Sequence, residues 1–334
     1  NYSVADHLFG SMILATAIDS EFRETNDLSK MYRMLILSEF SIQYPNYDFN
    51  SLKLGKKYVK EILEAKDMNT ENGKLVFKYK MLDHLLTKLI KEKEGYVLLS
   101  DLIDEGSKII SSLCSRQPYE GEEIFKFYYL NFKLKNKVRS GWDSKHWNIK
   151  LDRIETVSEH VTGTLSLAMI LNSEFEYNFN TDKELKMLVV HETGETLIGD
   201  ITPFDNITPE EKMQKEHEAM KEVIGDLINQ EEFLSLLFEF DEKKTKEAVF
   251  AHHCDKLEAD IQAKVYQDMG CQHSLDEQEN NVVFNNNKIR QMVEDGAQTA
   301  FDVWYEWDKS LYYDDENFAR LLDYIRTVDT QKDF

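Results

Sequence analysis

The sequence contains an internal repeat, which limits the folds that the chain can adopt. Residues 3–22 (SVADHLFGSMILATAIDSEF) align without a gap on residues 156–175 (TVSEHVTGTLSLAMILNSEF), an offset of 153. Over positions 3–42 this offset gives 12 identities in 40 aligned residues. Self-similarity over such a length indicates two copies of one structural unit, and we predict them at residues 1–135 and 136–334.

Further along the chain the offset grows, because the second copy is longer. Two short matches mark this growth: Val76-Phe77 with Val249-Phe250 at an offset of 173, and Asp104-Glu105-Gly106 with Glu294-Asp295-Gly296 at an offset of 190. The added length includes the polar stretch from Gly270 to Lys288, whose composition predicts a surface loop.

The hydrophobic pattern inside each copy has the period of a helix. Val161, Leu165, Ala168 and Leu171 recur at steps of three and four residues, which places them on one helical face. No segment alternates apolar and polar residues between turn signals, and the chain holds only 13 Gly and 4 Pro in 334 residues. We therefore predict an all-α protein built from two tandem helical bundles.

Composition excludes several classes of partner and setting. With 40 Lys and Arg against 62 Asp and Glu, the formal net charge is -22, which argues against a nucleic-acid polymer or an anionic membrane as partner. A small anion bound in a local basic pocket stays compatible with this charge. The longest largely apolar run, Met12 to Ile18, is too short to span a bilayer and lacks the basic flank of a signal peptide. Three scattered cysteines form no disulfide framework, so we expect a reducing, cytoplasmic setting.

The residues best suited to chemistry lie in the second copy, in the segment HETGE at residues 191–195. On a continuous helix His191 and Glu195 are four residues apart and share a face. Imidazole and carboxylate groups together suit a divalent first-row metal or magnesium, with further ligands from other helices such as His160 and Asp255. A His beside a Glu is by itself weak evidence, because most such pairs are solvated surface residues.

Five motifs in a fixed order make this signal specific. They are RSGW (139–142), RIETVSEH (153–160), HETGETLIGD (191–200), DNITPEEK (205–212) and CDKLEADIQA (254–263). Over about residues 130–270 this series closely resembles the HD-domain metal-dependent phosphohydrolases, in their 5′-deoxynucleotidase-like branch. The resemblance implies tandem HD-domain bundles and a hydrolase that removes the 5′-phosphate from (deoxy)nucleoside monophosphates or a similar small phosphomonoester.

Carried over residue by residue, the resemblance implies a complete metal-dependent site. The expected ligands of a divalent ion (Co²⁺, Mn²⁺ or Mg²⁺) are His160, His191, Glu192 and Asp255. Glu195 would hydrogen-bond the metal-bound water and transfer a proton, and Asp200 would orient that water or the sugar end of the substrate. Arg139 would bind the phosphate and Arg153 would line the same pocket, since guanidinium groups suit phosphate even in an acidic chain. One departure is Glu192, which stands where the family has Asp.

The first copy lacks part of this set. Its counterparts of His160, Glu192, His191 and Glu195 are, in turn, His7, Glu39, Ser38 and Ile42. Asp83 matches Asp255 only after a one-residue shift. We therefore expect a structural partner without a complete metal site. Because family members of this type commonly pair as homodimers, the resemblance implies a pseudo-dimer within the chain, with further oligomerisation open. A second hypothesis is that the degenerate pocket binds a regulatory nucleotide.

Histidines outside this set leave alternatives open. His217 follows His191 by 26 residues, which loosely resembles the di-iron oxygenases built on the same scaffold, although no other His lies between His217 and His252. His252 and His253 adjoin Asp255, and they either approach the metal or pack among other side chains.

A third class of function is a nucleotide sensor without catalysis. Glu192 in place of Asp and the degenerate first copy are the observations that suggest it. The intact set of Glu195, Asp200 and Arg139 favours a hydrolase instead, because a protein that only binds has no need of groups for proton transfer.

Overall fold

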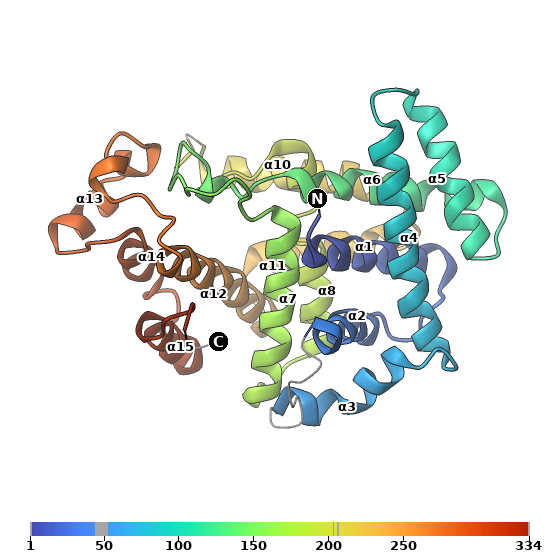
Figure 1. The fold of residues 1–334 in the computed structure, drawn as a ribbon, viewed down its shortest axis with the longest axis horizontal. Helices are drawn as coiled ribbons and strands as arrows, with labels where there is room; N and C mark the ends of the chain where they lie inside the picture. Colours follow the sequence, from blue (N-terminus) through green and yellow to red (C-terminus); the bar gives the residue numbers. More distant parts are fainter. Residues whose placement is uncertain (1, 44–52, 203, 206, 333–334) are drawn as a thin grey trace.

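The computed structural model describes residues 2–43, 53–202, 204–205 and 207–332, and these residues form helices without any β-strand (Figure 1). The predicted all-α class is confirmed. The α-helices are α1 (Val4–Phe22), α2 (Leu28–Gln43), α3 (Lys53–Lys66), α4 (Glu71–Lys93), α5 (Leu99–Leu113), α6 (Glu122–Phe132), α7 (Val157–Glu174), α8 (Thr181–Val190), α9 (Glu195–Ile198), α10 (Pro209–Ile224), α11 (Gln230–Glu242), α12 (Lys246–Asp268), α13 (Asn287–Glu294), α14 (Ala300–Asp308) and α15 (Glu316–Thr327).

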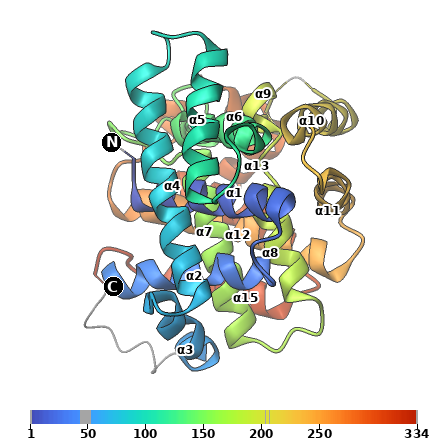
Figure 2. The same cartoon turned by 90° about the vertical axis from the view of Figure 1, so that its right-hand side faces the viewer.

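The two halves of the chain pack against each other around α7. In Figure 1, α4 to α6 lie on the right, α12 to α15 lie on the left, and α7 runs between them. Helix α1 packs on α7, and α2 packs on α8. Figure 2 shows α10 and α11 together on the side opposite α4. One core of buried apolar side chains extends through both halves. The predicted boundary after residue 135 falls inside a short 3-10 helix (Lys133–Asn136) and not in a linker.

Helices α1 and α7, which begin the two predicted copies, start in the same way. Each opens with a capping box, Ser3 with Asp6 in α1 and Thr156 with Glu159 in α7. A box of this kind satisfies two backbone N–H groups that would otherwise lack a partner at the helix start. Helix α1 is then apolar on nearly every side, with Met12 fully buried, so it lies inside the core and not on the surface.

A buried carboxylate joins the start of α1 to the start of α7. Asp6 Oδ1 accepts hydrogen bonds from Thr156 Oγ1 at 2.9 Å and from Ser158 Oγ at 2.6 Å, and Asp6 Oδ2 accepts one from Arg153 at 3.1 Å. A buried carboxylate is costly unless it is hydrogen-bonded, so this network favours one arrangement of the two helix starts. It thereby fixes the place of His160, which lies one turn further along α7.

Two details of the sequence interpretation are wrong. Residues 270–288 contain no α-helix before Asn287, as expected of a loop, but Val283 within them is fully buried in the core. The match of Gly106 with Gly296 also fails. Gly106 lies inside α5 against the ring of Phe125, whereas Gly296 follows α13 with φ 116°.

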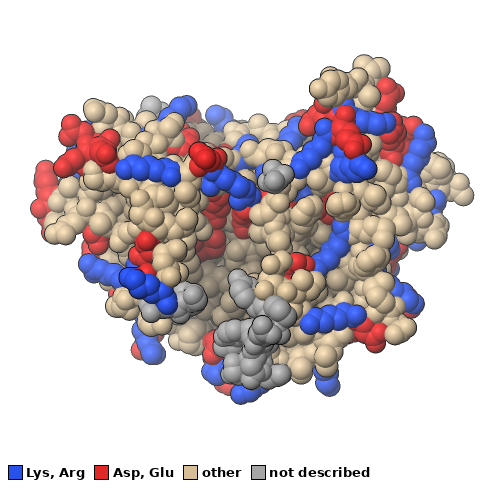
Figure 3. Space-filling view, viewed as in Figure 1, with Lys and Arg blue, Asp and Glu red and all other residues tan. Residues whose placement is uncertain are grey.

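The surface carries both signs of charge. On the face shown in Figure 3, acidic and basic side chains are interspersed over both halves of the chain. Interspersed charges of opposite sign keep the long-range field of a face weak. None of the described helices is long and apolar enough to cross a lipid bilayer.

Candidate metal centre

Four side chains converge at the junction of α7, α8 and α12. They are His160 on α7, His191 and Glu192 directly after α8, and Asp255 on α12. We call them the four-residue cluster, and they are the four ligands that the sequence predicts. Their ligand atoms lie within 4.8 Å of one another. His160 Nε2 lies 2.9 Å from Asp255 Oδ1 and 3.6 Å from Glu192 Oε1, and His191 Nε2 lies 3.6 Å from Glu192 Oε1.

Each imidazole of the cluster is held through its other nitrogen. His191 Nδ1 lies 2.8 Å from the carbonyl oxygen of Leu188, and since a carbonyl can only accept, Nδ1 carries the proton. His191 Nε2 is then an acceptor, and it is buried without a hydrogen-bond partner. His160 Nδ1 lies 2.5 Å from Glu258 Oε2, which orients that ring from outside the cluster. Metal-binding histidines are commonly held in this way, with the second nitrogen free for the metal.

The donor set of the cluster fits a divalent cation. Burial raises the pKa of Glu192, but the neighbouring His191 and Arg139 lower it to about 2. Burial acts on Asp255 in the same direction, whereas Lys256 and the neighbouring imidazoles hold its pKa well below the ordinary value. Both carboxyls are therefore ionised at neutral pH. Two carboxylates together with an unpartnered, buried imidazole nitrogen are the ligands that zinc and other first-row divalent ions take.

The HETGE segment is not a continuous helix, so the predicted helical face shared by His191 and Glu195 is wrong. Helix α8 ends at Val190, and α9 starts only at Glu195. Between them Thr193 N donates to Val190 O and Glu195 N donates to Glu192 O, each at 3.0 Å. In a continuous helix neighbouring residues point about 100° apart. The turn after α8 instead lets two consecutive side chains, His191 and Glu192, enter the same cluster.

Glu195 lies next to the cluster on the first turn of α9. Its side chain is buried, and its Oε2 has no hydrogen-bond partner. Burial and the charges of Asp200 and Glu192 raise the pKa of Glu195 well above the ordinary value, although Arg139 lowers it. The carbonyl oxygen of Glu195 accepts a hydrogen bond from Lys137 Nζ. Glu195 is therefore a carboxyl group that can hold and release a proton beside the cluster.

Arg139 lies among the acidic groups of the site. Its Nη1 donates to Glu192 Oε1 at 2.7 Å, and its Nε lies 3.9 Å from Asp200 Oδ2. Only 14% of its side chain is exposed. Asp200 Oδ2 also accepts from the backbone N–H of Ser140 at 2.7 Å, which holds the segment that carries Arg139. Both residues therefore lie at the edge of the cluster.

Arg153 is not part of this site. Its guanidinium donates to Asp6 at 3.1 Å and to Glu159 at 2.7 Å, and about half of the side chain (49%) is exposed. The structure records no contact between Arg153 and the four-residue cluster. The reason is tertiary: Arg153 precedes α7 at its contact with α1, where the buried carboxylate of Asp6 attracts it.

Two residues of α12 contact the cluster without having been predicted. Glu258 binds the ring of His160, and Lys256 Nζ lies 3.0 Å from Asp255 Oδ2. The spacing contained a signal for Glu258, because Asp255 and Glu258 are three residues apart and share a helical face. No local pattern distinguishes Lys256 from other surface lysines.

The remaining histidines of interest lie outside the cluster. His217 Nε2 pairs with Asp241 Oδ2 at 2.7 Å. His253 packs edge-on against the rings of Tyr312 and Phe318, so of the two alternatives for this residue the packing one is correct. The centroid of the His252 ring lies 6.1 Å from the centroid of the Phe240 ring.

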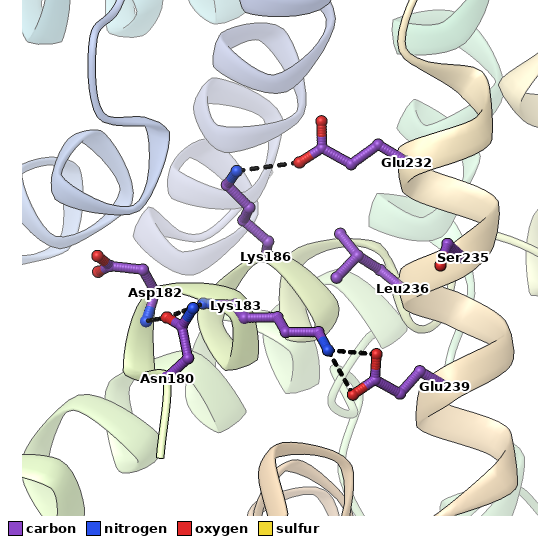
Figure 4. Close-up of a pocket in the computed structure, with 8 residues that line it drawn as sticks. All are labelled: Asn180, Asp182, Lys183, Lys186, Glu232, Ser235, Leu236 and Glu239. Atoms are coloured by element: carbon purple, nitrogen blue, oxygen red, sulfur yellow. Dashed lines mark hydrogen bonds and ion pairs between the residues drawn. The ribbon is translucent and has the colours of Figure 1, made fainter. Parts of the chain in front are cut away.

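A surface pocket of about 370 Å³ lies elsewhere, between α8 and α11 (Figure 4). Two ion pairs cross it: Lys186 with Glu232 at 3.0 Å and Lys183 with Glu239. Both lysines are therefore already neutralised within the pocket. It contains none of the residues predicted for the site, and we assign it no ligand.

The fold and the site together define an all-helical protein with a buried cluster of two histidines and two carboxylates. The HD domain matches residues 132–295, a range that includes every residue predicted for the site. The mouse protein named 5′-deoxynucleotidase HDDC2 is 31% identical over 151 residues, which cover 45% of this chain and 72% of the mouse chain. The human protein of that name is 32% identical over 148 residues, 44% of this chain and 69% of the human one.

A relative from Dictyostelium discoideum with the same name is 34% identical over 149 residues, which cover 42% of this chain and 76% of that protein. This chain belongs to the HD-domain family. The family resemblance drawn from the five ordered motifs is thereby confirmed.

Proposed function

We propose that this chain is a metal-dependent phosphohydrolase that removes the 5′-phosphate from (deoxy)nucleoside monophosphates or a similar small phosphomonoester. One observation carries the proposal: the four-residue cluster offers four ligand atoms within 4.8 Å, one of them a buried nitrogen without a partner. Similarity to proteins named 5′-deoxynucleotidases supports the substrate class.

The four-residue cluster would hold one divalent ion. Such an ion would polarise a phosphoryl group and lower the pKa of water, which is how metals promote phosphate hydrolysis. Glu258 and the carbonyl of Leu188 keep the two imidazoles in the orientation that binding requires. Glu192 supplies its carboxylate from a side chain that is one methylene longer than the Asp of the family.

Two cations at the edge of the cluster would bind the phosphate. Arg139 offers a planar fork of N–H donors, and Lys256 offers a point charge next to Asp255. Both side chains now contact cluster carboxylates, so each has a hydrogen-bonding partner before substrate arrives. A divalent ion held by Glu192 and Asp255 would offset these carboxylates and leave both cations available to an anion, although the chain has a net charge of -22.

Two carboxyl groups would handle protons and orientation. Glu195, buried with a free Oε2, would transfer a proton during attack by water. Asp200 would orient that water or the sugar end of the substrate, and it already fixes the Arg139 segment through the N–H of Ser140. Arg153 has no part in this proposal, because its guanidinium lies at the contact between the two copies.

The experiment is phosphate release from a panel of deoxynucleoside and ribonucleoside 5′-monophosphates. Metal is first removed with a chelator, and Co²⁺, Mn²⁺ or Mg²⁺ is then added back. We expect release only with added metal and none from His191→Ala. The matched control is His217→Ala, a partly buried histidine that pairs with Asp241 outside the cluster and whose loss leaves release intact. An oxygenase that used His217 would instead lose function with this variant.

A second variant tests the phosphate contact. Arg139→Ala removes charge-assisted hydrogen bonds worth about 3 kcal/mol, so kcat/KM falls by about 100-fold while the protein still binds metal. If the protein binds metal but the whole panel stays unhydrolysed, the hydrolase proposal is wrong, and a sensor that binds the same nucleotides becomes the better account.

A further inference from the structure

Helices α4 and α12 fix how the two copies correspond beyond their first two helices. Both have 23 residues, and both follow a threonine whose hydroxyl accepts from the N–H three residues on, Thr70 in the first copy and Thr245 in the second. These caps give an offset of 175 in place of the 173 that the sequence match suggests. At this offset Lys80 is the counterpart of Asp255, a member of the four-residue cluster.

A repeated contact between imidazole and carboxylate supports this correspondence. His7 Nδ1 lies 2.6 Å from Asp83 Oδ2, and His160 Nδ1 lies 2.5 Å from Glu258 Oε2. At the offset of 153, His7 is the counterpart of His160. At the offset of 175, Asp83 is the counterpart of Glu258. The match of Asp83 with Asp255, which the sequence allows only after a one-residue shift, is thus replaced by a match of Asp83 with Glu258, about one helical turn further on.

A repeated glycine independently supports the offset of 175 between α4 and α12. A Cβ placed on Gly10 would lie 1.7 Å from Asp83 Oδ1, and one placed on Gly163 would lie 2.5 Å from Glu258 Oε1. Both distances are far below van der Waals contact, so each glycine makes room for the carboxylate that binds the histidine one turn earlier. The same three-part arrangement therefore occurs in both copies.

The two copies differ where the cluster would bind its ion. Lys80 Nζ lies 2.7 Å from Glu39 Oε2 and 2.8 Å from Ser38 Oγ. Glu39 and Ser38 are the counterparts of Glu192 and His191. The lysine therefore directs its ammonium group at the carboxylate that matches a predicted metal ligand, from the helix that supplies Asp255 in the second copy.

The four predicted ligands of the second copy and their four counterparts in the first copy also differ in net charge. With neutral imidazoles, the second set is twice negative, and it consists of His160, His191, Glu192 and Asp255. The first set is neutral, and it consists of His7, Ser38, Glu39 and Lys80. The two carboxylates of the second set pair with cations outside the set, Arg139 and Lys256, whereas in the first set the Lys80 ammonium itself pairs with Glu39 and leaves no charge that calls for a further cation.

We propose that the Lys80 ammonium permanently takes the place of the metal ion in the first copy, so that the chain binds a divalent ion at the four-residue cluster alone. The ammonium pairs with Glu39 and needs no free ligand position. The first copy therefore has no hydrolytic centre, and its folding does not depend on metal.

The first test is a metal count on the chelator-treated chain after it is refilled with Co²⁺ and freed of excess by gel filtration. We expect about one ion per chain from atomic emission, and about none from His191→Ala. Two ions per chain in the wild-type protein, or one that survives in His191→Ala at the same affinity, would overturn the proposal.

The second test restores the missing ligands. Ser38→His with Lys80→Asp gives the first copy the ligand set of the second, and it is made in the His191→Ala background so that only the new site counts. We expect the count to rise from about none to about one Co²⁺ per chain, with a Tm that increases as Co²⁺ is added. Lys80→Met in the same background is the control, because it removes the ammonium without supplying a ligand. A folded variant that binds no ion contradicts the proposal.

A double-mutant cycle covers the case in which the restored variant does not fold. Lys80→Met alone leaves the Glu39 carboxylate without its cation and lowers the unfolding midpoint, whereas Lys80→Met with Glu39→Gln recovers most of it. Additive effects of the two changes would mean that Lys80 does not balance Glu39. None of these measurements depends on hydrolysis, so a failed hydrolase assay and a failed Lys80 proposal are separate results.

Discussion

The buried carboxyl of Glu184 makes the stability of the chain depend on pH. The size of this dependence can be worked out from the structure. Asn172 Nδ2 donates to Glu184 Oε2 at 2.8 Å, while Glu184 Oε1 and Asn172 Oδ1 are both buried without partners. An ionised carboxylate leaves two such acceptors without any donor, and protonation supplies one. Burial accordingly raises the pKa of Glu184 to about 8, although Asn172 and Lys57 lower it.

The sign follows from comparing the folded and unfolded chains. In the unfolded chain the carboxyl ionises above its ordinary pKa of 4.5, whereas in the folded chain it stays protonated until about pH 8. Its contribution is fully present below pH 4.5 and is lost as pH rises towards 8. At pH 7 the loss is about 3 kcal/mol, since each pH unit above 4.5 costs about 1.4 kcal/mol.

Glu184→Gln removes this dependence, because the amide has the same shape and no charge to bury. We expect its unfolding free energy, relative to that of the wild type, to rise by about 3 kcal/mol between pH 4.5 and pH 7, measured by urea unfolding of chelator-treated protein. Glu71→Gln, at a side chain that is 87% exposed, is the control and should shift by less than about 0.5 kcal/mol. A difference that is flat with pH, or that falls as pH rises, would refute this explanation.

Two further predictions concern the contacts around the paired carboxylates. Gly163→Ala pushes Glu258 away from His160, so we expect the metal affinity, measured by calorimetric titration, to fall about 10-fold. The control, Gly10→Ala, leaves that affinity unchanged. Equal affinities in the two variants would contradict the positioning role of Glu258. Lys135→Met breaks a 2.5 Å ion pair with Asp83 in which both side chains are fully buried, so the unfolding free energy drops by about 3 kcal/mol or more in urea. A drop below about 1 kcal/mol would show that solvent reaches the pair.

The sequence was sufficient for the fold class and for the set of residues that meet in the site. Helical periodicity and scarce Gly and Pro are local properties, and local properties decide between helix and strand. The order of the motifs predicted which residues meet in the site, and the structure does bring together His160, His191, Glu192 and Asp255 from three separate segments. Their role as metal ligands stays a prediction that the metal count will test.

What the sequence missed depends on tertiary contacts. The break after Val190 has no Pro, and its one glycine, Gly194, keeps a right-handed helical conformation, so HETGE looked like one helix. Arg153 was expected at the phosphate, yet the buried Asp6 from the other copy attracts its charge, and no pattern near Arg153 shows this. The offset between α4 and α12 was misjudged by two residues, because short apolar matches fit several registers of a helix equally well. Cap residues and repeated contacts fix the register unambiguously.

The comparison of the two copies separates what holds this fold together from what gives it chemistry. The pairing of a histidine with a carboxylate beside a glycine occurs in both copies, although only the second offers the full predicted ligand set. That pairing therefore belongs to the joint between the first helix and the long helix of each copy. Ser38 and Lys80 stand at the positions that match two predicted ligands, His191 and Asp255, and Lys80 contacts both Ser38 and Glu39 there. On the Lys80 proposal this half of the chain keeps its fold without a metal, because the ammonium supplies the cation that the remaining carboxylate needs.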